Sequence, residues 1–253
     1  MKDYRHEPVV TLGWMDDGGA LLAGAMGQLA DDDLAAPSAL PGWSRAHVLA
    51  HLARNADALG HLVTWARTGI ETPMYADPAQ REAGIEMGAH QDPERLRADV
   101  TSSATALRGA LSALREESWV AQVRSARGRI VPATEIPWMR ARELWLHTVD
   151  LQVPEIEVVL PDLLAQAFLV DICEAFDGRS DTPPLTLVVP DGDADLTGSS
   201  GNGGERLHVH RGRLATTVWG RASDLVLWLT GRASGASLHT SGTSGLPPLP
   251  QWL

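Results

Sequence analysis

The chain has 253 residues, of which 44% are hydrophobic and 21% are charged, and its formal net charge is −11. This composition is ordinary for a globular protein and excludes a disordered chain, while the acidic balance argues against non-specific binding to nucleic acid or to an anionic membrane. No apolar run approaches the roughly 20 residues of a membrane-spanning helix, and the N-terminal sequence MKDYRHEP lacks the apolar segment of a secretory signal, so we expect a cytoplasmic protein.

Helical spacing dominates the first part of the chain. Apolar residues recur with the period of a helix over residues 17–31, and residues 36–43 then form a loop rich in proline and glycine. Ser44 has the character of an N-cap for a long helix that ends at Gly69, in the position C-terminal glycines prefer. Residues 71–80 contain two prolines and are expected to form a loop.

A second pair of helices is predicted before the composition changes. One helix covers residues 92–115, and another starts at Pro137 and ends before Pro154. Between them, residues 122–131 are compatible with a short hairpin or an extended stretch. The pattern therefore predicts a four-helix bundle over residues 1–153.

The remaining residues, 154–253, are expected to form a small α/β domain, which makes the whole chain an α+β protein. Its predicted elements follow one another in the order helix, strand, turn, hairpin, helix and strand. They cover residues 160–176, 185–193 (a β-rich run with a turn signal), 199–205, 206–220 (a hairpin closed around Arg211–Gly212), 221–232 and 236–242.

Two pairs of polar residues carry the spacing of a metal site. His47 and His51 are four residues apart on one predicted helix, and Glu143 and His147 are four apart on another, so each pair shares a helix face. Helical bundles build metal sites from such pairs on facing helices. Three imidazole and carboxylate ligands suit zinc and leave a fourth position open for chemistry.

The same residues also allow a simpler interpretation. Histidines on helices are often only solvated, and Glu143 lies near Arg140 and Arg142, so a surface ion pair would explain it. Against this, the helix around Glu143 and His147 is crowded with apolar residues, and a polar stripe buried there needs a partner. Both interpretations stay open on spacing alone.

Four sequence runs resemble a known family. In chain order they are PGWSRAHVLAHLARNADAL, WARTGIETPMY, WMRARELWLHTVDL and PPLPQWL. Together they are similar to the mycothiol-dependent maleylpyruvate isomerases, which belong to the DinB-like metal-binding helical bundles. The resemblance spans nearly the whole chain and implies a DinB-like four-helix bundle followed by a small C-terminal α/β domain.

The resemblance also implies site residues. The family's zinc ligands fall on His51, Glu143 and His147, and a functional arginine of the C-terminal domain falls on Arg232 in the run LWLTGR. His47 matches a histidine near the site that is not a ligand. We expect Arg232 and His47 to be catalytic, with His47 as a proton relay or a donor to a ligand. A packed histidine bonded to a backbone carbonyl is the alternative for His47.

The implied reaction is the cis–trans isomerisation of maleylpyruvate to fumarylpyruvate in gentisate degradation, with zinc or a similar divalent metal and mycothiol as cofactors. Reversible addition of a thiolate turns the double bond into a single bond that can rotate. Cys173, the chain's one cysteine, lies in an apolar helix and is a poor nucleophile, so the thiol must be external. The residues that recognise the thiol are not identified.

Two alternatives stay open: a mycothiol S-transferase acting on another electrophile, and a non-catalytic ligand-binding module with a metal site. In each case the expected partners are small molecules, an anionic substrate or ligand and a low-molecular-weight thiol, with no nucleic acid and no membrane. The chain is expected to be a monomer.

Overall fold

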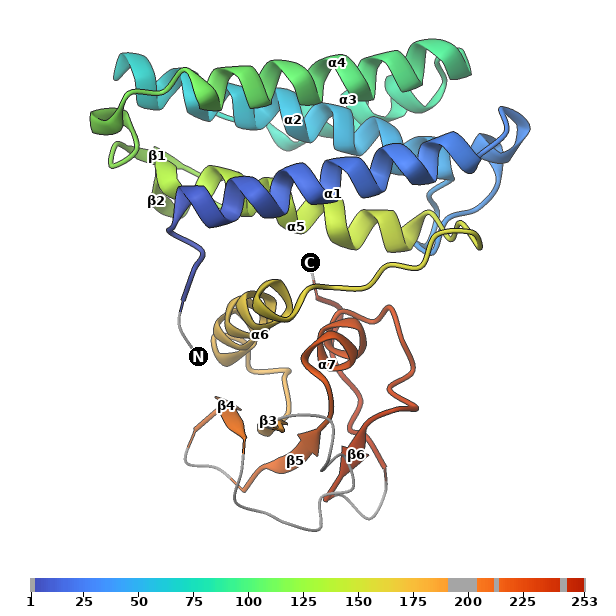
Figure 1. Cartoon of the computed structure of the whole chain (residues 1–253), viewed down its shortest axis with the longest axis vertical. Coiled ribbons are helices and arrows are strands. Elements are labelled where there is room, and N and C mark those ends of the chain that lie inside the picture. The colour runs from blue at the N-terminus through green and yellow to red at the C-terminus, as the bar shows by residue number, and fades with distance from the viewer. Residues whose placement is uncertain (1–2, 191–203, 212–213, 242–244, 253) are drawn as a thin grey trace. The chain divides into compact units, whose positions relative to one another are not determined.

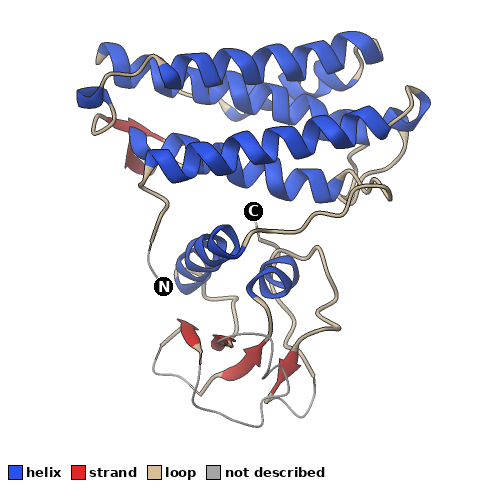
Figure 2. Cartoon of the chain, viewed as in Figure 1, coloured by secondary structure: helices blue, strands red, loops and turns tan. Residues whose placement is uncertain are grey.

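The computed structural model describes residues 3–190, 204–211, 214–241 and 245–252. The chain divides into two compact units, one covering Tyr4–Val158 and the other beginning at Val159 (Figures 1 and 2). The first unit is mainly helical and the second combines helices with a sheet, which confirms the α+β class. The sequence analysis placed the boundary between residues 153 and 154, inside the segment that follows the last helix of the first unit.

The first unit is built around one central helix. Its helices are α1 (Pro8–Gln28), α2 (Arg45–Thr68), α3 (Pro78–Ala89), α4 (Pro93–Ser112) and α5 (Ile136–Asp150). Helix α2 packs against α3, α4 and α5, and α1 packs against α5 (Figure 1). Along α2 the apolar residues Leu49, Leu52 and Leu59 are completely buried, so this helix forms the middle of the core.

Both ends of α2 follow the sequence signals. The Ser44 hydroxyl accepts a hydrogen bond from the backbone N–H of His47, which satisfies one of the unpaired donors at the helix start. At the other end Gly69 adopts φ 73°, a left-handed conformation that glycine reaches without steric cost. The predicted limits of this helix are therefore confirmed.

Helices α1 and α5 approach closely at Gly18. A Cβ atom at this position would lie 2.8 Å from Nε1 of Trp145, so only glycine leaves room for the indole. That indole nitrogen donates a 2.8 Å hydrogen bond to the carbonyl of Trp14 on α1. The close contact between α1 and α5 at the Trp145 indole therefore requires a glycine at position 18.

Two boundaries in this unit differ from the prediction. Helix α1 begins at Pro8 instead of residue 17, because packing against α5 outweighs the weak helix propensity of its valines, threonine and glycines. The loop predicted over residues 71–80 ends at Asp77, whose carboxylate accepts a 2.8 Å bond from the backbone N–H of Gln80 and caps α3. Helix α3 itself was not predicted.

A short hairpin precedes α5. Strands β1 (Gln122–Arg124) and β2 (Ile130–Pro132) pair antiparallel, with Val123 opposite Val131. Both valines are buried, and the hairpin alternative for residues 122–131 is confirmed.

The second unit packs helices with a four-stranded sheet. Its elements are α6 (Asp162–Asp177), β3 (Leu185–Val189), β4 (Glu205–Val209), β5 (Thr216–Trp219), α7 (Ala222–Leu229) and β6 (His239–Thr240). The strand order is β4-β3-β5-β6, and α6 packs against α7 and β4. Phe168 and Phe176 of α6 are completely buried and anchor the core of this unit.

The hairpin predicted over residues 206–220 is wrong. Strand β3 lies between β4 and β5, pairing antiparallel with β4 and parallel with β5. The two predicted arms are therefore separated by a strand from earlier in the chain, a long-range pairing that no local turn signal encodes. Gly212 and most of the turn expected at residues 199–205 lie outside the described residues.

Within the part of the chain that the structure describes, no helix combines the length and the apolar character needed to cross a membrane.

Candidate metal centre

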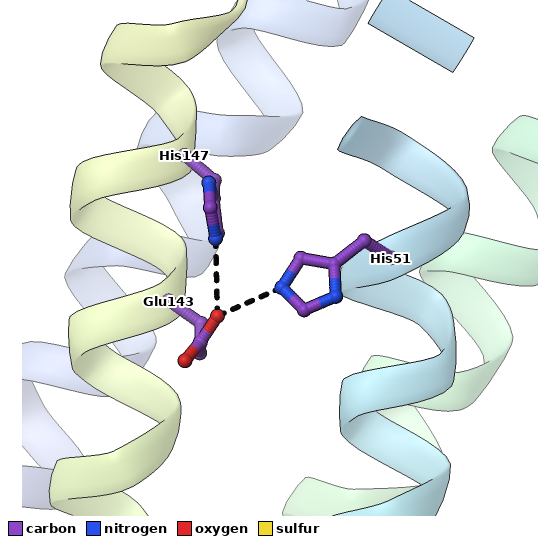
Figure 3. A group of neighbouring side chains, drawn as sticks. All are labelled: His51, Glu143 and His147. Carbon is purple, nitrogen blue, oxygen red and sulfur yellow. Dashed lines mark hydrogen bonds and ion pairs between the residues drawn. The ribbon is translucent and has the colours of Figure 1, made fainter. Parts of the chain in front are cut away.

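Helices α2 and α5 bring three side chains together. His51 comes from α2, and Glu143 and His147 come from successive turns of α5 (Figure 3). Oε2 of Glu143 lies 2.8 Å from Nε2 of His51 and 3.1 Å from Nε2 of His147. The two spacings noted in the sequence therefore converge on one point between the two helices.

The donor set fits a divalent transition metal. One ligand atom from each of the three residues lies within 4.8 Å of the other two. Tetrahedral ligands at about 2.1 Å from zinc are separated by roughly 3.4 Å, so small side-chain shifts would make room for an ion. Two imidazoles and one carboxylate also leave a fourth coordination position open.

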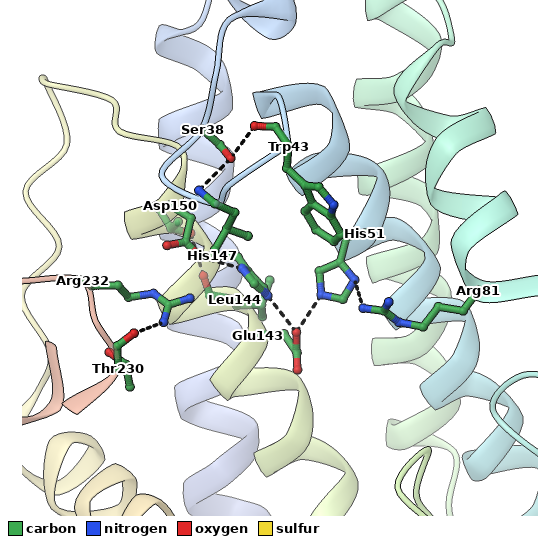
Figure 4. A network of polar contacts seen from close by, with 12 residues as sticks. Ser38, Trp43, His51, Arg81, Glu143, Leu144, His147, Asp150, Thr230 and Arg232 are labelled. Atoms are coloured by element: carbon green, nitrogen blue, oxygen red, sulfur yellow. Dashed lines mark hydrogen bonds and ion pairs between the residues drawn. The ribbon is translucent and has the colours of Figure 1, made fainter. Parts of the chain in front are cut away.

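Asp150 fixes the orientation of the His147 ring. Its Oδ2 lies 2.8 Å from Nδ1 of His147, and the carboxylate is almost fully buried (Figure 4). A carboxylate at this position holds a proton on Nδ1, which leaves Nε2, the nitrogen that faces Glu143, as the one that could bind a cation. Metal-binding histidines commonly have such a partner.

The three side chains are joined by hydrogen bonds whose protons a bound cation would displace. Burial lowers the pKa of His51, and the neighbouring charges of His147 and Arg81 lower it further despite the bond to Glu143. Burial would also lower the pKa of His147, but its bonds to Asp150 and Glu143 outweigh burial and raise it. Burial would raise the pKa of Glu143, yet the bonds from the two histidines hold it well below its usual range.

Arg140 ties the two ligand-bearing helices together. It is buried on α5, and its Nη1 donates to the carbonyl of Leu52 at 2.7 Å and to Oδ1 of Asn55 at 2.8 Å, both on α2. Burial lowers the pKa of the guanidinium to about 10. Arg140 is therefore a buried cross-link beside the ligands, which contradicts a surface ion pair with Glu143.

His47 lies one turn before His51 on α2 but does not join the three converging side chains. Its Nδ1 lies 2.7 Å from the Ser44 hydroxyl and accepts from the Ser44 backbone N–H, completing a capping box. Its Nε2 lies 3.2 Å from Oε2 of Glu86 on α3. Both ring nitrogens thus have partners at the start of α2.

Arg232 lies in the second unit, just after α7. Its backbone N–H donates to the carbonyl of Leu227 at 2.7 Å, and its Nη1 donates to the carbonyl of Thr230 at 3.1 Å. The intervening Gly231 has φ 75° and turns the chain at the end of the helix. The side chain of Arg232 is partly buried.

Three further residues lie near the candidate metal ligands. Nη2 of Arg81, on α3, lies 3.4 Å from Nδ1 of His51 (Figure 4). Burial raises the pKa of the Tyr75 hydroxyl, although the charge of Arg81 acts to lower it. The ring centroid of Trp43 lies 5.5 Å from that of His51. Arg81 was not predicted because its helix was not identified, and Tyr75 was not predicted because it lies in a loop that carries no metal-ligand spacing.

Cys173 has the inert character expected from the sequence. Its side chain is buried in α6, and burial raises the pKa of the thiol to about 12. Almost none of it is ionised near neutral pH, so it cannot supply a nucleophilic sulfur.

A helical bundle with His51, Glu143 and His147 gathered between two helices, followed by a small α/β unit, defines a class of proteins with a candidate metal-ligand triad in the bundle. Residues 15–152 match the family model described as the Mycothiol maleylpyruvate isomerase N-terminal domain. Because this match covers more than half of the chain, the chain belongs to that family, which is a family of enzymes.

Two solved structures are similar to this chain over its full length. The chain is similar to the crystal structure of a mycothiol-dependent maleylpyruvate isomerase, with 29% identity, a TM-score of 0.86 and 100% of both chains covered. A histidine-to-alanine mutant of that type of enzyme matches with the same identity of 29%, TM-score of 0.86 and coverage of 100%. No curated protein sequence matches the chain.

Proposed function

We propose that the chain is a metal- and mycothiol-dependent isomerase that converts maleylpyruvate to fumarylpyruvate, a step of gentisate degradation. The observation that carries the proposal is the convergence of His51, Glu143 and His147 on one point in a member of this family. Two imidazoles and a carboxylate with an open fourth position favour zinc or a similar divalent ion.

The external cofactors supply the bond-changing chemistry, and the chain supplies their placement. A divalent cation at this site would keep a bound thiol deprotonated, and such a thiolate adds reversibly to a conjugated double bond and permits rotation. His51, Glu143 and His147 would hold the cation, while Asp150 keeps Nε2 of His147 available.

Two further residues belong to the proposal. Arg232 would pair with a substrate carboxylate or with the negative charge that develops on a substrate oxygen. His47 would act as a proton relay or would position the ligand helix through its bonds to Ser44 and Glu86. A local positive charge such as that of Arg232 is needed because the net charge of −11 repels a dianionic substrate.

The proposal extends to the setting of the reaction. A reaction that consumes and regenerates a free thiol favours the reducing cytoplasm. The substrate is a small anion, and we propose that one monomer carries a complete site.

A thiol-dependent assay with a chelation control tests the proposal. Purified wild-type protein is expected to contain about one divalent ion per chain and to isomerise maleylpyruvate only when mycothiol is present. Treatment with a chelator should abolish turnover, and re-addition of the metal should restore it. The variant His51→Ala should lose both metal and turnover, whereas the exposed variant Arg95→Gln should lose neither.

Specific results would contradict each part. Turnover that is equally fast without thiol refutes the addition mechanism, and metal content unchanged by His51→Ala refutes the ligand assignment. A stable thioether product identifies an S-transferase instead. The variant Arg232→Ala should reduce turnover with the metal content intact, and parallel loss of metal would show that the variant is misfolded.

A further inference from the structure

A second cationic group lies beside the metal ligands and has no part in the function proposed above. Arg81 projects from α3, and its Nη2 lies 3.4 Å from Nδ1 of His51, on the side of the ring opposite Glu143 (Figure 4). Its side chain is partly buried, and its charge acts to lower the pKa of Tyr75, which burial raises. Arg81, Tyr75 and the three candidate ligands all belong to the same compact unit.

The hydrogen-bond chemistry of this contact depends on which nitrogen of His51 carries the proton. With Nε2 donating to Glu143, Nδ1 can accept from Arg81. A histidine that uses Nε2 as a metal ligand keeps its proton on Nδ1. Nδ1 of His51 and the guanidinium of Arg81 would then be neighbouring donors, because arginine has no acceptor.

Two adjacent donors call for an acceptor that both can reach. A carboxylate oxygen accepts several hydrogen bonds, and the planar fork of a guanidinium matches a carboxylate in two parallel bonds. Partial burial also weakens the screening of the charge by water.

The surrounding charge makes such a group necessary. The chain as a whole carries −11, and Glu143 places a further carboxylate at the centre of the site. A dianionic substrate that approaches this face meets repulsion unless a fixed positive charge offsets it. Arg81 supplies that charge in direct contact with one of the candidate ligands.

We propose that Arg81 binds a carboxylate of the substrate next to the candidate metal centre. The inference rests on the proposed function for the identity of the substrate, and it assigns one of the two substrate carboxylates to the helical unit. Arg81 is then a substrate-binding residue.

Binding of maleate to metal-loaded protein tests this assignment without turnover. Calorimetry and tryptophan fluorescence measure the affinity, the latter because the Trp43 ring centroid lies 5.5 Å from that of His51. Arg81→Gln should retain its metal and raise the Kd for maleate about ten- to hundredfold, the range expected for losing charge-assisted hydrogen bonds. The Kd of Arg81→Lys for maleate should lie between those of wild type and Arg81→Gln, because lysine keeps the charge but lacks the planar guanidinium.

Controls separate binding from folding and from the thiol. Arg95→Gln removes the same charge from an exposed position on α4 and should leave the Kd within twofold of wild type. Mycothiol alone, titrated into Arg81→Gln, should bind as it does to wild type. A matching loss of thiol affinity would overturn the assignment to a substrate carboxylate.

Two further outcomes would overturn the proposal: a maleate Kd unchanged in Arg81→Gln, or loss of the metal in that variant. Its failure is distinguishable from failure of the proposed function. If wild-type protein binds maleate through Arg81 but does not isomerise maleylpyruvate, the carboxylate site stands and the proposed function fails. If wild-type protein isomerises and Arg81→Gln has an unchanged KM, only the carboxylate site fails.

Discussion

The buried carboxylate of Asp150 offers the sharpest test of how the candidate metal centre is organised. The substitution Asp150→Asn keeps the shape of the side chain and removes its charge. Asp150 Oδ2 lies 2.8 Å from Nδ1 of His147, and only 1% of the residue is exposed, so water cannot replace the lost interaction. The amide oxygen can still accept a bond, but a neutral partner makes His147 a weaker ligand.

The expected effect is a ten- to hundredfold loss of metal affinity, about 1.4–2.8 kcal/mol. Competition with a chromophoric chelator measures the Kd for zinc in wild type and in Asp150→Asn. The matched control is Asp16→Asn, which makes the same change in an exposed ion pair with Arg108. Equal affinities in wild type and Asp150→Asn, with both proteins folded, would refute the idea that Asp150 tunes the ligand.

Three other predictions follow from the same structure. Metal affinity should fall as the pH is lowered from about 8 to about 6, because the pKa of His147 is raised and a metal must displace its proton. Calorimetry in buffers of different ionisation enthalpy detects the released proton. A metal affinity that is independent of pH would contradict this prediction. Cys173 should resist alkylation in the folded protein near neutral pH and react fully in denaturant, because burial raises the pKa of its thiol to about 12; rapid modification of the native state would show that the thiol is accessible. Arg140→Met should lower the free energy of unfolding by about 2–4 kcal/mol, because it leaves the Leu52 carbonyl and Asn55 without their donor. Urea denaturation measures the loss. An unchanged urea midpoint would mean that these hydrogen bonds make no net contribution to stability.

The sequence predicts best the features that local chemistry specifies. Ser44 and Gly69 delimit α2 because capping and left-handed backbone preferences act within a few residues. The three residues of the candidate metal centre were also found, since a spacing of four places Glu143 and His147 on one face of α5. Local spacing does not show which helix packs against α5. The assignment of His51 as the third ligand came from the family resemblance.

The features that sequence analysis missed depend on distant contacts. Helix α3 has few apolar residues, with Ile85 and Gly88 as its buried positions, and its glycines and proline hide the helical period. Arg81 was missed with it. In the second unit, β3 lies between β4 and β5 and pairs with both. The residues between β4 and β5 in the sequence carry no signal that predicts this pairing. Spacing also could not show that His47 bonds to Ser44 and Glu86 instead of facing Glu143.

The distance along the chain between the candidate ligands has a mechanical consequence. His51 and Glu143 are separated by 92 positions, so an ion held by both in the folded protein would be a reversible cross-link between distant parts of the helical unit. Binding only the folded form, such an ion stabilises it by mass action, by about 2.7 kcal/mol at a hundredfold excess over Kd. The melting temperature would then rise with the concentration of the metal, so the stability of the fold would depend on the metal supply.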